Sequence, residues 1–142
     1  MIQEIKALMD KNLPLVSNLA NASAFLYSHY ENLNWAGFYL AKDNVLYLGP
    51  FQGEIACTYI PFSKGICGRA VTQKKTIIID NVLEDCDHIA CSSASRSEIV
   101  VPIIKDDVVY GVLDIDSPIF SRFGEKEKKE LEAVIDVLKD LF

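Results

Sequence analysis

The sequence predicts an α+β domain in which an antiparallel sheet of about six strands has N- and C-terminal helices packed on one face. Two observations predict it. Apolar residues recur every three or four positions near both ends of the chain, whereas apolar and polar residues alternate in the segments between, separated by turn signals. A strand meander with a helix at each end is typical of an antiparallel sheet covered on one side.

The length of 142 residues is close to that of one typical domain. We therefore expect a single domain over residues 1–142. Its N-terminal helices should occupy residues 1–33, its sheet and active-site loops residues 34–120, and its C-terminal helix residues 121–142. Half of the residues are apolar and 24% are charged, which is ordinary globular composition.

The helices are predicted from apolar spacing. A short amphipathic helix is expected over residues 2–11, and a second from Pro14 to about Glu31, because Pro is tolerated in the first turn of a helix. The apolar positions of the second helix are Leu15, Leu19, Ala22, Leu26 and Tyr30. A last helix, from about Gly124, has on one face Leu131, Val134, Ile135, Leu138 and Leu141.

The strands are predicted from a change of period to two at Asn34, with Trp35 and Tyr39 on the same side of their strand. A turn at residues 42–44 leads to a partner strand at 45–48, which the Gly- and Pro-containing segment 49–53 is expected to end. Further strands are predicted at about 57–62, 76–79, 98–104 and 108–115, with a short helix over 65–73. Residues 81–96 form a long polar connection, and such loops are usually functional.

The charge balance excludes two classes of partner. Twenty acidic and 14 basic residues give a net charge of −6, which argues against nucleic acid and against an anionic membrane surface. The sequence has neither a stretch of the length of a membrane span nor a signal peptide, so we expect a cytoplasmic protein. Four cysteines in a reducing compartment are more often catalytic, redox-active or metal-binding than stapled in structural disulfides.

Cys91 is the candidate nucleophile. It lies in a serine-rich loop, near His88 and Arg96, which could lower the pKa of its thiol. Cys57 and Cys67 could serve as second thiols, because a sulfenic acid needs a thiol with which to condense. Each of these cysteines could instead be a small hydrophobic residue of the core.

A zinc site is the alternative for the loop cysteines. Cys86, His88 and Cys91 could offer three ligands, but structural zinc sites usually combine two compact pairs, and the remaining cysteines are isolated in the sequence. We therefore expect no metal.

Three acids are candidates for substrate binding. Asp114 and Asp116 are two residues apart on a strand, so their carboxylates point to the same face, and Glu98 begins the preceding strand. Buried acids need a cation, a donor or water, which suits recognition of an ammonium group; close pairs also raise a pKa, so that one acid can serve as a general acid. The alternative is a strand end that reaches solvent. Trp35 and Tyr39 could form an apolar wall of the same cavity or belong to the core.

Seven motifs stand in order within about residues 34–120: Trp35-Ala36-Gly37-Phe38-Tyr39, Gly49-Pro50-Phe51-Gln52-Gly53, Ala56-Cys57, Gly65-Ile66-Cys67-Gly68, His88-Ile89-Ala90-Cys91, Ser97-Glu98-Ile99-Val100-Val101-Pro102 and Leu113-Asp114-Ile115-Asp116-Ser117. Together with three matching cysteines, they resemble the GAF-domain family of free methionine-(R)-sulfoxide reductases. An ordinary signalling GAF domain lacks that cysteine set.

The resemblance implies a GAF-like fold and a reductase in which Cys91 attacks and Cys57 or Cys67 resolves the intermediate, with Cys57 preferred. It implies that Glu98, Asp114 and Asp116 bind substrate beside Trp35 and Tyr39. From the paired acids and this resemblance together, we expect Asp116 or Glu98 to donate a proton to the sulfoxide oxygen. It also implies thioredoxin as electron donor, no bound cofactor, and a homodimer. The sequence departs from the family pattern at Ser92, where Asp is common, and at Cys86, an additional thiol.

The competing interpretation is a GAF regulatory domain that binds a small molecule without catalysis. A chain of this length would then need a partner through which to signal. The two interpretations differ in whether substrate consumes thiols.

Overall fold

The computed structural model describes residues 1–86, 88 and 93–142. Within them the elements are α1 (Ile2–Leu8), α2 (Leu15–His29), β1 (Trp35–Lys42), β2 (Val45–Gly53), β3 (Tyr59–Pro61), α3 (Gly65–Gln73), β4 (Ile77–Ile79), the 3-10 turn η1 (Val82–Glu84), β5 (Ser97–Lys105), β6 (Val108–Ser117), α4 (Glu125–Leu138) and the 3-10 turn η2 (Lys139–Leu141).

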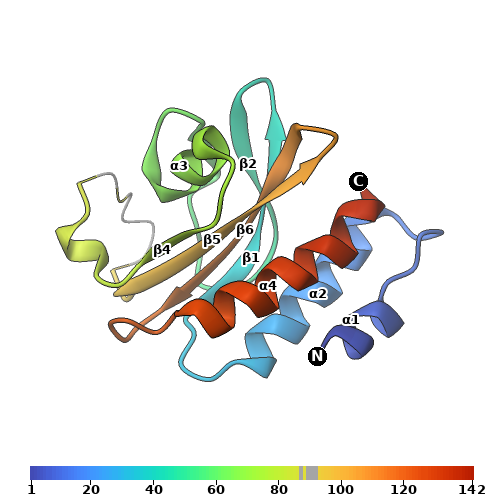
Figure 1. Ribbon diagram of the computed structural model, residues 1–142, viewed down its shortest axis with the longest axis horizontal. Helices are drawn as coiled ribbons and strands as arrows, with labels where there is room; N and C mark the ends of the chain where they lie inside the picture. The colour runs from blue at the N-terminus through green and yellow to red at the C-terminus, as the bar shows by residue number, and fades with distance from the viewer. Residues whose placement is uncertain (87, 89–92) are drawn as a thin grey trace.

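The described strands form one six-stranded sheet in the order β3-β2-β1-β6-β5-β4, and every neighbouring pair is antiparallel. Tight hairpins join β1 to β2 and β5 to β6, and the pairing of β1 with β6 brings the two hairpins together in the middle of the sheet (Figure 1). The predicted antiparallel sheet of about six strands is confirmed.

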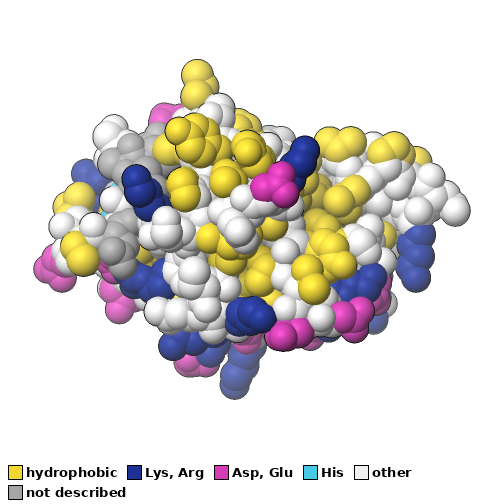
Figure 2. Space-filling view, turned by 90° about the horizontal axis from the view of Figure 1, so that it is seen from above, with side chains coloured by type: hydrophobic (Ala, Val, Ile, Leu, Met, Phe, Trp, Pro, Cys, Tyr) yellow, Lys and Arg dark blue, Asp and Glu magenta, His cyan; other side chains and the backbone are white. Residues whose placement is uncertain are grey.

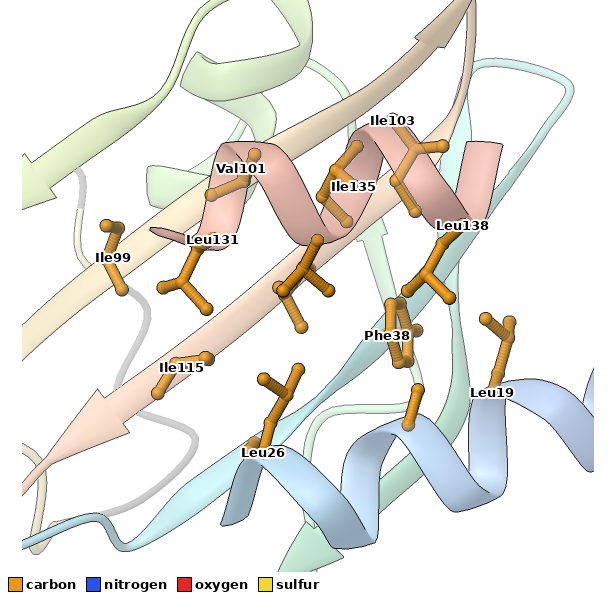
Figure 3. Close-up of a cluster of buried hydrophobic side chains, with 14 of the residues drawn as sticks. Leu19, Leu26, Phe38, Ile99, Val101, Ile103, Ile115, Leu131, Ile135 and Leu138 are labelled. Atoms are coloured by element: carbon orange, nitrogen blue, oxygen red, sulfur yellow. The ribbon is translucent and has the colours of Figure 1, made fainter. Parts of the chain in front are cut away.

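Helices α1, α2 and α4 cover one face of the sheet, and α3 covers the other (Figure 1). Between the terminal helices and the sheet lies the larger hydrophobic core, in which side chains from α2 and α4 pack against Phe38, Ile99 and Ile115 (Figure 3). Packing of the terminal helices on one face is therefore confirmed as well. In the part of the chain that is described, no helix combines the length and the apolar character needed to span a bilayer.

Strand β2 is longer than the sequence pattern predicts, since it continues through Gly49 and Pro50 to Gly53. A β-bulge explains the error: Gly37 of β1 pairs with Phe51, but Tyr39 pairs with Leu48, so β2 contains one extra residue. Pro50 is tolerated because the bulge interrupts the ladder at this point.

Other expected boundaries were also too wide. The first helix ends at Leu8 instead of residue 11, and the third strand spans Tyr59–Pro61 instead of residues 57–62. The segment expected to be an irregular connection after residue 80 begins with η1, whose first turn is capped by the Asn81 side chain accepting a hydrogen bond from Leu83 N–H.

Candidate active site

A small pocket lies between the sheet and α3, on the face opposite the terminal helices. It combines a thiol, carboxyl groups, an imidazole and aromatic rings. Its lining residues are Trp35, Tyr39, Ile55, Ala56, Ile60, Gly65, Ile66, Cys67, His88, Ser95, Glu98, Asp114 and Asp116.

The strand register brings the three predicted acids together. Glu98 of β5 is directly opposite Asp116 of β6, and Asp114 is the next residue of β6 on the same face. Between them, Ile115 points to the other face and belongs to the larger core. Glu98 is 5% exposed and Asp114 is 7% exposed, so these side chains are buried beneath α3 and do not extend into solvent at a strand end.

Burial and mutual repulsion raise the pKa of all three acids. Burial is the largest cause in each case. The neighbouring carboxylate of Asp116 adds to it for Asp114, whose pKa rises to about 8, and Glu98 does the same for Asp116. The pKa of Glu98 also lies well above its usual range, because burial and the charge of Asp114 both oppose its ionisation. The pocket can therefore hold protonated carboxyl groups near neutral pH.

One oxygen in this group has no protein donor. Asp114 Oδ1 is fully buried and makes no hydrogen bond to any described residue. A buried carboxylate oxygen without a donor destabilises the protein by roughly 1–3 kcal/mol. The pocket is therefore suited to a ligand that brings an N–H or O–H group.

An aromatic stack forms the wall of the pocket beside β1. The Trp35 ring stacks on Tyr39 at 5.8 Å between centroids and on Phe51 at 5.1 Å. The polar group of each lining ring makes a hydrogen bond: Trp35 Nε1 donates to Glu54 O at 3.1 Å, and the Tyr39 hydroxyl donates to Cys57 O at 3.0 Å. The rings thus present a fixed apolar surface beside the acids, since Trp35 of β1 pairs with Asp116 of β6.

Helix α3 positions Cys67 over the acids. Gly65 begins the helix with a φ of +71°, which favours glycine, and a side chain at Gly68 would lie 2.5 Å from Phe62 O. The two glycines therefore allow the first turn to pack closely on the sheet. Cys67 is 3% exposed and hydrogen-bonds to Asp114; burial, followed by the charge of Asp114, raises the pKa of its thiol.

The cysteines differ in their state. Neither Cys67, which is buried, nor Cys86, which is exposed, forms a disulfide, whereas Cys57 is disulfide-bonded. Cys57 does not line the pocket itself, but its neighbour Ala56 does. The proposed nucleophile, Cys91, and Ser92 lie outside the described residues.

The two basic residues considered near Cys91 have different surroundings. His88 lines the pocket, and burial lowers its pKa, although the charge of Asp85 partly opposes this. Neutral imidazole is therefore its main form at neutral pH. Arg96 Nη1 donates to Ser93 O at 2.9 Å and to Ser95 O at 3.0 Å, so its guanidinium binds the backbone of its own loop.

The sequence pattern missed several pocket residues. Ile55 lines the pocket although it is 91% exposed, and Ser95, which accepts a hydrogen bond from Asn34 Nδ2, lies in the polar connection. Phe51 does not line the pocket but stacks on Trp35, and this supporting role was missed because the bulge reverses the alternation of β2. The exposure of Ile55 had no signal in the sequence.

The surface above α3 and the strand ends is shown in Figure 2. Hydrophobic side chains gather over its upper and central parts, and Lys and Arg side chains mostly lie beside Asp and Glu along its lower edge. Among the described residues on this face, basic side chains are thus interspersed with acidic ones, unlike the basic clusters that bind phosphate backbones.

The chain is similar to proteins of known activity. The GAF domain family matches residues 17–138. Free methionine-R-sulfoxide reductase from Escherichia coli is 44% identical over 137 residues, covering 96% of this chain and 83% of that protein. The enzyme of the same name from Saccharomyces cerevisiae is 42% identical, with 94% and 78% covered. Among solved structures, free methionine-R-sulfoxide reductase from Neisseria meningitidis in complex with its substrate superposes with a TM-score of 0.94 at 40% identity, covering 99% of this chain and 85% of that one.

Proposed function

Because the chain belongs to the GAF-domain family of free methionine-R-sulfoxide reductases, we propose that it reduces free L-methionine (R)-sulfoxide to L-methionine. The observation that supports this most directly is the convergence of Glu98, Asp114 and Asp116 with a thiol in one small pocket. The enzyme would be an oxidoreductase that acts on sulfur and uses cysteine as its reductant.

The acids would bind the charged amino group of the substrate. An ammonium group offers three donors, and the buried Asp114 Oδ1 needs one. Binding a cation would also favour ionised carboxylates over the protonated forms that burial imposes. The aromatic wall of Trp35 and Tyr39 would contact the apolar part of the substrate side chain. A free amino group is required in this arrangement, so a residue within a peptide chain would be excluded.

The chemistry would proceed by transfer of oxygen to sulfur. Cys91 as a thiolate attacks the sulfoxide sulfur while a protonated carboxyl group, of Asp116 or Glu98, donates a proton to the sulfoxide oxygen. The attack forms a bond between Cys91 Sγ and the substrate sulfur, the S–O bond breaks, and the protonated oxygen leaves as water. A water molecule then attacks Cys91 Sγ, the S–S bond breaks, methionine leaves, and Cys91 becomes a sulfenic acid. Protonation matters because the oxygen would otherwise leave as a strong base. The raised pKa values of both acids are consistent with a proton donor at neutral pH.

A second thiol would then condense with the sulfenic acid, releasing water and forming a disulfide. We propose Cys57 for this role. In its favour, Cys57 is disulfide-bonded, whereas Cys67 has a free thiol whose raised pKa makes it a poor nucleophile. Two electrons from an external dithiol, proposed to be thioredoxin, would restore both thiols. We further propose that the protein acts as a homodimer in the cytoplasm and holds no cofactor.

The direct test is an assay of free methionine-R-sulfoxide, free methionine-S-sulfoxide and a peptide-bound form, with thioredoxin as reductant. Only the free R form should be reduced. Replacing Cys91→Ser should abolish turnover without changing the unfolding midpoint, whereas Cys86→Ser, at an exposed cysteine that does not line the pocket, serves as the matched control and should retain activity.

Counting thiols separates the enzyme from a binding domain. Starting from fully reduced protein, the enzyme should lose two titratable thiols per chain after addition of substrate without further reductant, and Cys57→Ser should prevent disulfide formation. Unchanged thiols together with ligand-dependent thermal stabilisation would contradict the reductase and support a regulatory GAF domain.

A further inference from the structure

Cys67 has no assigned step in the proposed reaction, yet it lies in the most polar part of the pocket. Its Sγ and one carboxylate oxygen each of Glu98 and Asp114 all lie within 4.8 Å of one another, and all three residues are buried. We propose that these three side chains form a binding site for one divalent transition-metal ion, with Zn²⁺ as the probe, that blocks the pocket.

The donor set matches the requirements of Zn²⁺. A thiolate and two carboxylates are established zinc ligands, with Zn–S near 2.3 Å and Zn–O near 2.0–2.2 Å, so ligand atoms in a tetrahedral site are roughly 3.3–3.8 Å apart. The separations in the pocket lie within reach of this geometry through small side-chain rotations. Ca²⁺ and Mg²⁺ prefer all-oxygen sites, so the thiol favours a softer ion.

A second observation points to a ligand at the same place. Asp114 is more than nine-tenths buried, lines the pocket, and its Oδ1 has no hydrogen-bond partner among the described residues. A metal bound between Cys67 and Asp114 would satisfy this oxygen. It would replace the thiol hydrogen bond, and the thiol proton would pass to solvent.

The surroundings provide the other features of a metal site. Asp116 hydrogen-bonds to Glu98 and can orient it as an outer-shell partner. Three protein ligands leave one tetrahedral position, which would face the pocket and could take water. The ion would occupy the position proposed above for the substrate amino group, so Zn²⁺ and substrate should compete. Metal binding itself does not depend on the reductase assignment.

The test uses a protein in which Cys67 is the only cysteine, prepared by replacing Cys57, Cys86 and Cys91 with Ser. No other thiol can then bind metal, and the protein cannot turn over, so the readout is independent of activity. Isothermal titration with Zn²⁺ should give one site per chain. Co²⁺ should give a thiolate charge-transfer band in the near ultraviolet and the visible spectrum of a tetrahedral ion.

In this background Cys67→Ser should remove the charge-transfer band, and Glu98→Gln and Asp114→Asn should each weaken binding at least about tenfold, because even outer-shell changes weaken metal binding by that factor. Asp107→Asn is the control, since Asp107 is exposed on the β5–β6 turn and far from the pocket in the fold. Circular dichroism would verify folding of each variant. Absence of saturable binding to the single-cysteine protein, or binding that Cys67→Ser leaves unchanged, would overturn the proposal.

In the unmodified chain, Zn²⁺ should raise KM for the sulfoxide in proportion to its concentration, and a chelator should reverse the effect. Metal binding without competition would contradict the overlap of the two sites. Competition that persists in the Cys67→Ser variant would assign inhibition to another thiol.

Discussion

The two faces of strand β6 differ although their residues alternate along one chain segment. Leu113 and Ile115 are fully buried in the larger core beneath the terminal helices. Asp114 and Asp116 point to the opposite face, where burial raises the pKa of both acids. Burial of the apolar residues therefore stabilises the folded state, whereas burial of the acids between them destabilises it.

This difference shows how the fold supports an unfavourable site. Each apolar side chain buried in the larger core contributes about 1.5–3 kcal/mol, whereas a buried, unpaired carboxyl group is destabilising when ionised. Because the apolar side chains and the acids lie on opposite faces of the pleated strand, the packing of the larger core does not depend on the side chains of the pocket. The predictions below test that separation, from the largest expected effect to the smallest.

Replacing Leu113→Ala should lower the free energy of unfolding by about 2–5 kcal/mol, because it leaves a cavity in the larger core. Urea denaturation measures this loss, and kcat/KM at a temperature where the variant is folded should stay close to that of the parent. The control is Leu83→Ala, since Leu83 is 67% exposed and should change stability by no more than about 0.5 kcal/mol. Equal losses in the two variants would contradict a core role for Leu113.

Replacing Asp114→Asn, at the neighbouring position, should lower activity without lowering stability. It should lower kcat/KM for free methionine-R-sulfoxide about 10- to 100-fold, the loss expected for a charged hydrogen bond of about 1.5–3 kcal/mol. The unfolding midpoint should stay the same or rise, because the amide needs no desolvation of charge. Steady-state kinetics and thermal unfolding measure the two effects. Asp107→Asn, on an exposed turn, is the matched control and should change neither.

The stability of the parent protein should fall as pH rises from about 4 to about 8. The pKa of Asp114 is raised from 3.8 to about 8 in the fold, so the folded state binds the proton more tightly than the unfolded chain. Its stabilising contribution is complete below the unfolded pKa and is lost as pH passes the folded value. The slope is about 1.4 kcal/mol per pH unit for one proton. Unfolding free energies across this window should show a flatter dependence in Asp114→Asn, and an identical slope would contradict the assignment.

Replacing Tyr39→Phe should lower the unfolding free energy by only about 0.5–1.5 kcal/mol, since it removes one hydrogen bond to Cys57 O but keeps the stacked ring. Urea denaturation would detect this loss. Tyr47→Phe removes the hydroxyl of a half-exposed ring and should have less effect. A loss above that range would mean that the site face also carries a major share of the stability.

The sequence predicted most of the sheet because alternation and register depend on local pattern. The common face of Asp114 and Asp116, the partner role of Glu98, and the orientation of Trp35 and Tyr39 all follow from a period of two. The helices that cover one face of the sheet were predicted from the spacing of apolar residues at both ends of the chain.

What the pattern could not predict depends on contacts between distant segments. The stack of Phe51 on Trp35 arises from a bulge, and no periodic rule marks the extra residue. The approach of Cys67 to Asp114 depends on how α3 crosses the sheet, which involves segments about fifty residues apart. Sequence alone therefore left the roles of Cys57 and Cys67 open.

The bulge in β2 has a consequence for how this chain can vary in length. One extra residue between Leu48 and Phe51 allows both side chains to point towards α3. Removing Gly49 or Pro50 would restore a regular ladder in which Leu48 still pairs with Tyr39 and Phe51 with Gly37, so Phe51 would keep its side and stay near Trp35. A deletion at Gly49 or Pro50 should therefore be tolerated better than a deletion elsewhere in β2, which would turn every residue beyond it to the other face, and the turn at residues 43–44 can lengthen without altering either face.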